Sequence, residues 1–182
     1  MPSPAPKFPP PGALVEAVIN YDLAAVKRLL QQGANPSDTD GYGNSALGRA
    51  ASYAYVEIAR VLIEAGAKLD MRNRLGETPL IIAVSTGYSA GRETIVRMLL
   101  DKGAKMDIKN NNGETAMDIA VSKSFTQIIK MMNEAAANRK RLADEFARAT
   151  TAKKQAEIAE KQKRLKELAR DVPKRPKPPK AA

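Results

Sequence analysis

Gly76-Glu77-Thr78-Pro79-Leu80 is one of three copies of a short phrase, which also reads Gly43-Asn44-Ser45-Ala46-Leu47 and Gly113-Glu114-Thr115-Ala116-Met117. A second phrase recurs with it, as Leu29–Ala34, Leu62–Ala67 and Leu99–Ala104. The glycine of this second phrase recurs after 33 residues, from Gly33 to Gly66, and then after 37 residues, at Gly103. A self-similar period of this size is typical of stacked repeats, in which each unit buries its apolar face against its neighbours. We therefore expect the function to lie in surface recognition.

The residues before each Gly-Ala pair follow a helical pattern. Spacings of three and four place the apolar ones on one helical face. Each glycine then stands where a helix end favours left-handed backbone angles. Pro79 suits the first turn of a helix, where its missing N–H is no loss. The positions on the apolar face are Leu23, Val26, Leu29 and Leu30, then Val56, Ala59, Leu62 and Ile63, then Val96, Leu99 and Leu100, with Glu93 as a departure.

These repeated residues resemble the ankyrin repeat. Gly76–Ala83 is the closest match to the family pattern, Asp40–Ala51 is a looser one, and the resemblance covers residues 13–133. It implies an all-α ankyrin-repeat solenoid of about four units including caps, in which helix–turn–helix units carry β-hairpin-like loops. We expect a long charged C-terminal helix to follow the solenoid.

The chain also departs from the family pattern. The family's histidine is absent, and Gly48, Ile81 and Asp118 stand in its place. The Thr-Pro pair occurs only at Thr78-Pro79. We therefore expect weaker hydrogen-bond networks in the turns that carry the first and third copies of the phrase.

Composition and charge divide the chain into segments. Residues 1–12 are a Pro-rich lead, expected to be extended, and residues 13–133 are the ankyrin-repeat domain. Residues 134–172 contain no Gly or Pro and predict a basic helical extension, and residues 173–182 are a Pro/Lys-rich tail expected to be disordered. Residues 138–180 hold 15 of the 30 Lys and Arg and 6 of the 20 acids, a net of +9, which leaves +1 for everything else.

The apolar side chains of the basic extension fall into two stripes, Leu142-Phe146-Ala149 and Leu165-Leu168-Val172. We expect the first stripe to cap the open end of the repeats, because a terminal repeat needs a cover. The second stripe folds back, docks on a partner or projects into solvent. The polar stretch between them breaks the sustained heptads that a coiled coil needs.

The charge of this extension leaves two interpretations open. Basic clusters such as Arg139-Lys140-Arg141 and Lys153-Lys154 would bind nucleic acid or an anionic membrane. Phe146 is the one aromatic residue there, so base stacking is not supported, and the apolar face is narrow for a membrane helix. The interpretation that we favour is a solvated or partner-docking helix with intrahelical pairs such as Lys163–Glu167.

The composition argues against an enzyme. The chain has no His and no Cys, which removes the commonest general base, the commonest metal ligand and the thiol nucleophile. Asp38–Gly43 resembles a calcium loop, but Arg49 stands where a bidentate Glu is needed. The glycines nearby lack the spacing of a dinucleotide-binding loop. We predict no enzyme activity, no cofactor and no metal site, and we interpret three recurring acids as turn formers: Asp40, Asp70 and Asp107.

The absence of Cys also bears on the compartment. It excludes disulfides without deciding where the protein works. Many exported bacterial proteins avoid unpaired Cys, so the bacterial periplasm is favoured over the cytoplasm. No stretch approaches the roughly 18 consecutive apolar residues that a membrane-spanning helix needs.

The resemblance also implies where a partner binds. In the ankyrin family the hairpin tips and the inner helices face a concave groove. We expect hot spots at Tyr42, Tyr53, Arg72 and Arg74, because Tyr and Arg are favoured interface anchors, and at Leu75, an apolar residue at an exposed tip. Carried over position by position, the partner-binding residues are Tyr42, Asn44, Arg72, Arg74, Leu75, Glu77, Lys109, Asn111, Asn112 and Glu114 in the hairpins, and Ser52, Tyr53, Ser85, Thr86, Ser122 and Lys123 on the inner helices.

The unit that contains Gly76 carries four extra residues, which lengthen the turn Gly87–Gly91. Surface loops tolerate insertion, so we favour neutral drift over a second contact site through Tyr88.

We predict a protein that engages one folded protein partner through the concave ankyrin surface and is monomeric when free. Small bacterial ankyrin proteins that resemble this chain often sit on a specific enzyme, which implies an enzyme inhibitor of the immunity type. The alternative is an adaptor that anchors to nucleic acid or an anionic membrane through its basic C-terminal helix. Binding through that helix would be lost steeply with added salt.

Overall fold

The computed structural model describes residues 9–86 and 91–170, with side chains up to residue 166. Within these ranges the regular structure is helical, and the helices come in pairs joined by short turns. The sequence-based prediction of an all-α repeat fold with a long C-terminal helix is confirmed. The pairs are α1 (Ala13–Ile19) with α2 (Leu23–Gln31), α3 (Ala46–Ser52) with α4 (Val56–Glu64), α5 (Pro79–Ser85) with α6 (Arg92–Asp101), and α7 (Ala116–Ser122) with α8 (Thr126–Arg170).

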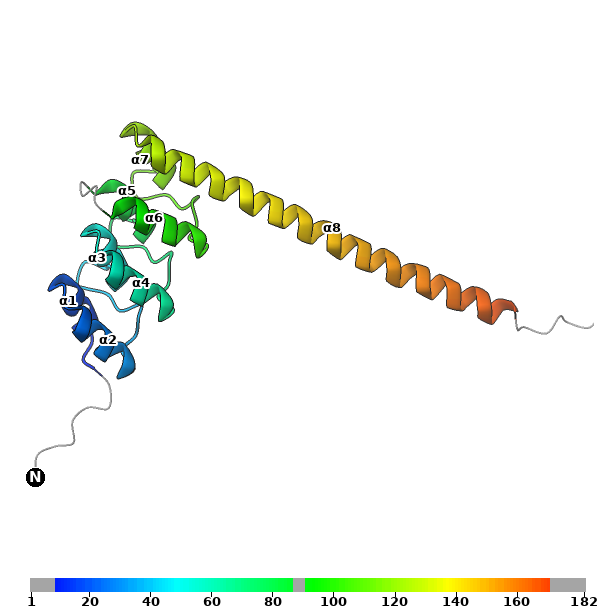
Figure 1. Cartoon of the computed structure of the whole chain (residues 1–182), viewed down its shortest axis with the longest axis horizontal. Coiled ribbons are helices and arrows are strands. Elements are labelled where there is room, and N and C mark those ends of the chain that lie inside the picture. The colour runs from blue at the N-terminus through cyan, green and yellow to red at the C-terminus, as the bar shows by residue number, and fades with distance from the viewer. Residues whose placement is uncertain (1–8, 87–90, 171–182) are drawn as a thin grey trace, which may run out of the picture. The chain divides into compact units, whose positions relative to one another are not determined.

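The helix pairs stack side by side in two layers (Figure 1). The first helices of successive pairs contact one another, α1 with α3, α3 with α5 and α5 with α7, and so do α2, α4 and α6. Each unit therefore packs on the units before and after it, as the repeat period requires. The loop before α3 also forms one antiparallel bridge, between Thr39 and Ser45.

The repeated phrase starts the first helix of a unit. Its hydroxyl side chain accepts a backbone N–H: Ser45 Oγ from Gly48 at 3.0 Å, Thr78 Oγ1 from Ile81 at 3.3 Å, and Thr115 Oγ1 from Asp118 at 3.2 Å. Pro79 occupies the first turn of α5, as expected. The expectation of weaker bonding in the other two copies is wrong at these caps. Ser45 caps as well as Thr does, and Asp118 completes a capping box by accepting the Thr115 N–H.

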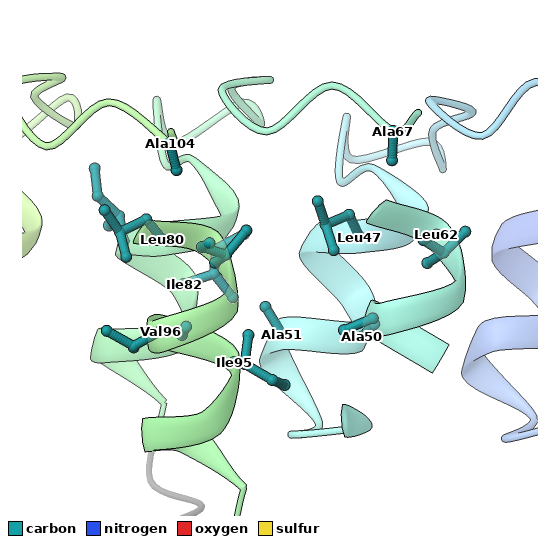
Figure 2. Packing of buried hydrophobic residues seen from close by; sticks show 14 of the residues in the cluster. Leu47, Ala50, Ala51, Leu62, Ala67, Leu80, Ile82, Ile95, Val96 and Ala104 are labelled. Carbon is teal, nitrogen blue, oxygen red and sulfur yellow. The ribbon is translucent and has the colours of Figure 1, made fainter. Parts of the chain in front are cut away.

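The core is a thin layer of aliphatic side chains between the helices. Leu47, Leu62 and Leu80 are at most 1% exposed, and small residues allow neighbouring helices to approach closely. Figure 2 shows Ala67 and Ala104 directed from the loops after α4 and α6 toward these leucines. A core of this thickness is filled by Leu, Ile, Val and Ala, which accounts for the 4% aromatic content.

Two sets of turns place the backbone in the left-handed region. Gly33, Gly66 and Gly103, which follow the second helices, have φ of 85°, 86° and 94°, as the Gly-Ala phrase predicted. A second set lies between the two helices of a unit and uses residues that carry a Cβ, for which this region is unfavourable. They are Tyr21, Ala54 and Ser124, with φ of 54°, 56° and 56°.

The chain divides into two compact units, Met1–Ala136 and Ala137–Ala182. The first turns of α8 belong to the first unit, where Ile128, Met131 and Met132 are buried in the core. In the second unit every described side chain from residue 140 to 166 is exposed. Leu142 is 60% and Phe146 is 75% exposed. The capping of the repeats by the stripe Leu142-Phe146-Ala149 stays a prediction, because it depends on how the two units are placed relative to each other.

Several expectations fall on residues outside the described ranges. These are the Pro-rich lead up to residue 8, the extra turn with Tyr88, and the Pro/Lys-rich tail. The described part of α8 extends to Arg170, and the expected stop before Pro173 lies outside the described residues.

Candidate recognition groove

A groove of about 620 Å³ opens between the loops that precede α3 and α5 and the two helices themselves. The loops supply aromatic, aliphatic and charged side chains, and the helices supply hydroxyls, an arginine and an isoleucine. The lining residues are Tyr42, Asn44, Arg49, Ser52, Asn73, Arg74, Leu75, Glu77, Ile82, Ser85 and Thr86.

The groove is largely built from two copies of the same four positions. Each pair is 33 residues apart, so the period that builds the core also places these surface side chains. In three of the four pairs the two copies carry different residue types, so the two repeats contribute different side chains to the groove. The pairs are Tyr42 with Leu75, Asn44 with Glu77, Arg49 with Ile82, and Ser52 with Ser85.

Asp40 organises the first hairpin and one groove residue. Its Oδ1 accepts the backbone N–H of Tyr42 at 2.8 Å and that of Asn44 at 2.9 Å. Its Oδ2 accepts Arg49 Nε at 2.7 Å, and Arg49 Nη2 lies 2.5 Å from the same oxygen. The interpretation of Asp40 as a turn former is therefore confirmed, and the carboxylate also fixes the guanidinium of Arg49.

The pKa of Asp40 reflects this environment. Partial burial raises the pKa of the carboxyl, but hydrogen bonds from Arg49, Asn44 and Tyr42 lower it by more, so the net pKa lies below its ordinary value of 3.8. The side chains of Arg49 and Asp40 are only 22% and 14% exposed, which shields the pair in part from water. The carboxylate is thus ionised, and the pair intact, through the neutral range of pH.

Asparagine takes the place of Asp40 in the next two hairpins. Asn73 Oδ1 accepts the N–H groups of Leu75 and Glu77, both at 2.9 Å, and Asn110 does the same in the last hairpin. An amide therefore suffices for the turn. Asp70, which we had grouped with Asp40, joins successive loops instead, because its Oδ1 accepts the N–H of Lys105 at 2.8 Å.

Neighbouring hairpins are tied together by hydrogen bonds. The N–H of Arg74 donates to Tyr42 O at 3.2 Å, and that of Asn111 donates to Leu75 O at 2.9 Å. Arg72 Nη2 reaches Lys109 O at 3.1 Å. Arg72 and Asn111 were predicted as contact residues, and their side chains also hold the loops in place, since Asn111 Nδ2 donates to Arg74 O at 2.9 Å.

The tips above these bonds expose large apolar groups. Tyr42 is 67% and Leu75 is 63% exposed, although the backbone of both residues is hydrogen-bonded. Arg49 Cζ lies 6.0 Å from the centroid of the Tyr42 ring. Because this backbone is already fixed, a partner that covers the two side chains does not have to order the loops that carry them.

The groove gathers part of the predicted site. It includes Tyr42, Asn44, Ser52, Arg74, Leu75, Glu77, Ser85 and Thr86, whereas Tyr53, Arg72, Lys109, Asn111, Asn112, Glu114, Ser122 and Lys123 are not among its lining residues. Tyr53 caps the end of α3, where its ring lies 5.2 Å from that of Tyr55, and the Tyr55 ring lies 4.5 Å from that of Tyr21. Tyr53 therefore belongs to a cluster of tyrosines at the turns between paired helices.

Sequence reasoning missed three lining residues, Arg49, Asn73 and Ile82. A signal for two of them was present, because Arg49 and Ile82 stand one helical turn before Ser52 and Ser85 and so share their face. Asn73 offered no such signal beyond its place in the hairpin.

The groove offers hydrogen bonds, apolar contact and a paired charge. Among the described residues, His, Cys, Asp and Glu do not gather in a group of three that could hold a metal ion. None of the helices in the described part of the chain is long and apolar enough to cross a membrane.

Comparisons with known proteins agree with this architecture. A family model described as "Ankyrin repeats (3 copies)" matches residues 14–110 and 66–141. The solved structure of an ankyrin repeat domain from Acinetobacter baumannii AYE is similar, with a TM-score of 0.65 and 31% identity over 68% of this chain and 63% of that chain.

Curated relatives match over shorter stretches. Protein PhlB of Serratia liquefaciens is 39% identical over 72 residues, which is 39% of this chain and 32% of that protein. Protein phosphatase 1 regulatory subunit 27 of Homo sapiens is 42% identical over 67 residues, 37% of this chain and 44% of that protein. The chain spans less than half the length of these curated relatives. Ankyrin repeat domains generally bind protein partners and are typically non-catalytic. The chain belongs to the ankyrin-repeat family of protein-binding modules.

Proposed function

We propose that the protein binds one folded protein partner through the groove between α3, α5 and their hairpins. The observation that carries this proposal is the exposure of Tyr42 and Leu75 at adjacent tips, 67% and 63%, on a backbone fixed by hydrogen bonds between hairpins. Exposed apolar groups that are surrounded by polar ones are typical of interaction sites.

The charges of the groove support a polar rim around these anchors. The Arg49 guanidinium is already paired with Asp40, and Glu77 Oε2 accepts Asn73 Nδ2 at 3.0 Å. Arg74 is exposed and its side chain lines the groove beside Leu75. Arginine and tyrosine carry a large share of the binding energy in protein interfaces, so Tyr42 and Arg74 are the anchors that we propose.

We further propose that the partner is an enzyme and that binding restrains it. The similar protein named as a regulatory subunit of protein phosphatase 1 makes an enzyme a reasonable class of partner. A rigid groove can also cover a surface without changing its own shape.

The experiment is a capture from the native host with the full chain, followed by identification and purification of the captured protein. The Kd is then measured for the full chain and for Tyr42→Ala/Arg74→Ala. The matched control is Tyr21→Ala/Arg97→Ala, which removes the same two residue types from exposed positions outside the groove. We expect the groove variant to bind at least about 100-fold more weakly, because two hot-spot side chains are lost.

The second candidate function is anchoring through the basic helix. The observation that favours it is the exposure of every described side chain from 140 to 166, which include Lys153, Lys154, Lys161 and Lys163. If replacement of these lysines by Gln abolishes capture while the groove variant still binds, the groove proposal fails. The enzyme proposal fails separately if the captured protein is an enzyme whose rate is unchanged at saturation.

A further inference from the structure

The Pro-rich lead enters the first unit beside the groove. Gly12, the residue before α1, donates its N–H to Asp38 Oδ2 at 2.6 Å. Asp38 lies at the base of the hairpin that carries Tyr42, since its carbonyl oxygen accepts the N–H of Ala46, the first residue of α3, at 2.9 Å. The chain before α1 is therefore held against the loop that forms one wall of the groove.

The repeat period relates this part of the chain to the groove. The first residues of α1 and α3, Ala13 and Ala46, are 33 residues apart, and so are Pro9 and Tyr42, and Tyr42 and Leu75. Since α1 packs on α3 as α3 packs on α5, and packed helices lie about 8–10 Å apart, one unit corresponds to roughly 10 Å. Pro9 is therefore roughly 10 Å from Tyr42 and roughly 20 Å from Leu75.

The residues before Pro9 have the length to reach the groove. Residues 1–8 carry a proline at every second position from Pro2 to Pro6. Proline-rich segments favour the polyproline II conformation, which advances about 3.1 Å per residue, so eight residues would span about 25 Å. This length covers the distance from Pro9 to Leu75.

The groove also has the chemistry that binds such a segment. Proline-rich segments dock on exposed aromatic side chains, and their carbonyl groups accept hydrogen bonds from the receptor because they have none within the segment. Tyr42 and Leu75 supply the exposed apolar groups, and Ser52, Ser85 and Arg74 supply donors along the same groove. Its volume of about 620 Å³ lies in the range of about 300–1,000 Å³ that is typical of ligand sites.

We propose that residues 1–8 of the Pro-rich lead dock in this groove in the free protein and compete there with the partner. The competition rests on the proposed function, whereas the docking needs no partner. A short tether gives an effective concentration of about 1 mM, so a contact with an intrinsic Kd of about 0.3 mM leaves the groove open for about a quarter of the time. The apparent affinity for a partner falls by the open fraction, which amounts to about fourfold.

Docking is tested by paramagnetic broadening in the ¹⁵N-labelled full chain. A nitroxide is attached at Ser3→Cys, the single thiol because the chain has no Cys, and the same sample with the nitroxide reduced is the reference. Ser3 stands six residues before Pro9, about 19 Å in this conformation, so we expect broadening of the Leu75 and Ser85 amides. The matched control carries the nitroxide at Ala181→Cys in the Pro/Lys-rich tail and should leave these amides sharp. Sharp groove amides with the Ser3 label, or equal broadening from both labels, overturn the proposal.

Two further samples identify the surface and the copy. Tyr42→Ala/Leu75→Ala changes only exposed side chains of the groove and should abolish the broadening, whereas Tyr21→Ala, at an exposed tyrosine outside the groove, should leave it. Broadening that persists in the groove variant overturns the assignment to the groove. In a mixture of ¹⁵N-labelled wild type with Ser3→Cys nitroxide chain at natural isotope abundance, we expect no broadening. Broadening in the mixture would assign the lead to a second copy of the chain and overturn docking within one chain.

Competition is tested with the protein captured in the groove experiment. A full chain with three lead prolines replaced should bind it about fourfold more tightly, by release of the groove: Pro2→Gly/Pro4→Gly/Pro6→Gly. The matched control makes the same change at three prolines of the tail and should leave the Kd unchanged: Pro176→Gly/Pro178→Gly/Pro179→Gly. An unchanged Kd in the lead variant overturns the competition. Failure of the proposed function is a separate result, in which Tyr42→Ala/Arg74→Ala binds the captured protein as tightly as the wild type.

Discussion

The repeats and the long helix beyond residue 136 are both helical, and they are stable for different reasons. The helices α1 to α7 are 7 to 10 residues long, too short to persist alone in water. They are held by buried side chains such as Leu47 and Leu80. From residue 140 to 166 every described side chain is exposed, so that stretch of α8 rests on intrinsic helix propensity and on local pairs.

This difference has a consequence for recognition. In the repeats, core packing and bonds between hairpins fix the backbone that carries a surface side chain such as Tyr42. Along the exposed part of α8 a side chain is fixed by its own helix alone. The repeats are therefore suited to shape-specific binding, and the helix to attraction by charge.

The largest expected effect is the removal of a core side chain. Leu80→Ala should destabilise the repeats by about 3 kcal/mol, since Leu80 is 1% exposed and its loss leaves a cavity. Urea unfolding followed by tyrosine fluorescence measures this effect. All five tyrosines lie between residues 21 and 88, so the signal reports the repeats.

The matched variant in the helix is Leu165→Ala. Leu165 is 56% exposed, so we expect a change within about 0.5 kcal/mol, typical of surface substitutions. A cost close to that of Leu80→Ala would show that this part of α8 depends on tertiary packing, as the repeats do.

The second effect concerns ion pairs. Asp40→Ala should cost about 2 kcal/mol, because it removes two turn hydrogen bonds and leaves the half-buried Arg49 unpaired. Asp40→Asn should cost less than Asp40→Ala, since Asn73 and Asn110 make the same turn bonds with an amide.

Glu160→Gln, which breaks the exposed pair with Arg164, should cost only about 0.3 kcal/mol. Urea unfolding of each variant measures the Asp40 effects, and far-UV circular dichroism measures the Glu160 effect.

The Asp40 pair also predicts a dependence on pH. The folded-state pKa of Asp40 lies below its ordinary value of 3.8, so its contribution is present above about pH 4 and is lost as the pH falls through the folded pKa. Between pH 5 and pH 2 the wild type should therefore lose more stability than Asp40→Asn. Asp118, whose pKa the Thr115 hydrogen bonds also lower, supplies acid dependence that both proteins share. Parallel stability curves would contradict this assignment.

The last effect, on the backbone conformation, has opposite signs in the two regions. Ser124 adopts a φ of 56°, so Ser124→Gly should stabilise the repeats by about 1 kcal/mol through relief of left-handed strain. Ala159 is an exposed residue within α8, and Ala159→Gly should weaken the helix locally by about 1 kcal/mol. Urea unfolding measures the first change and far-UV circular dichroism the second. If both substitutions changed the stability in the same direction, strain in the turns and helix propensity in α8 would not distinguish the two regions.

Most of the fold could be predicted because its signals are local. Gly66 and Thr78-Pro79 each need only a few neighbouring residues to define a helix end. The period of 33 then placed these ends in successive units. The hydroxyl caps in the other two copies were underrated, since Ser45 and Thr115 make the cap bond without a following proline.

The candidate site was harder to predict because it depends on neighbours that are distant in the sequence. Arg72 was read as a free contact residue, but its guanidinium reaches a carbonyl 37 residues away, at Lys109. Tyr53 was assigned to the groove from the pattern of an inner helix, yet it stands at the C-cap of α3 and stacks on Tyr55.

The most direct test of the account compares binding of the captured partner by two variants of the full chain. One is Tyr42→Ala/Arg74→Ala in the groove, and the other replaces Lys153, Lys154, Lys161 and Lys163 by Gln in the helix. We expect the groove variant to raise the Kd by about 100-fold or more, while the helix variant stays within about threefold of wild type at physiological salt. A Kd that rises with the helix variant and not with the groove variant would contradict it.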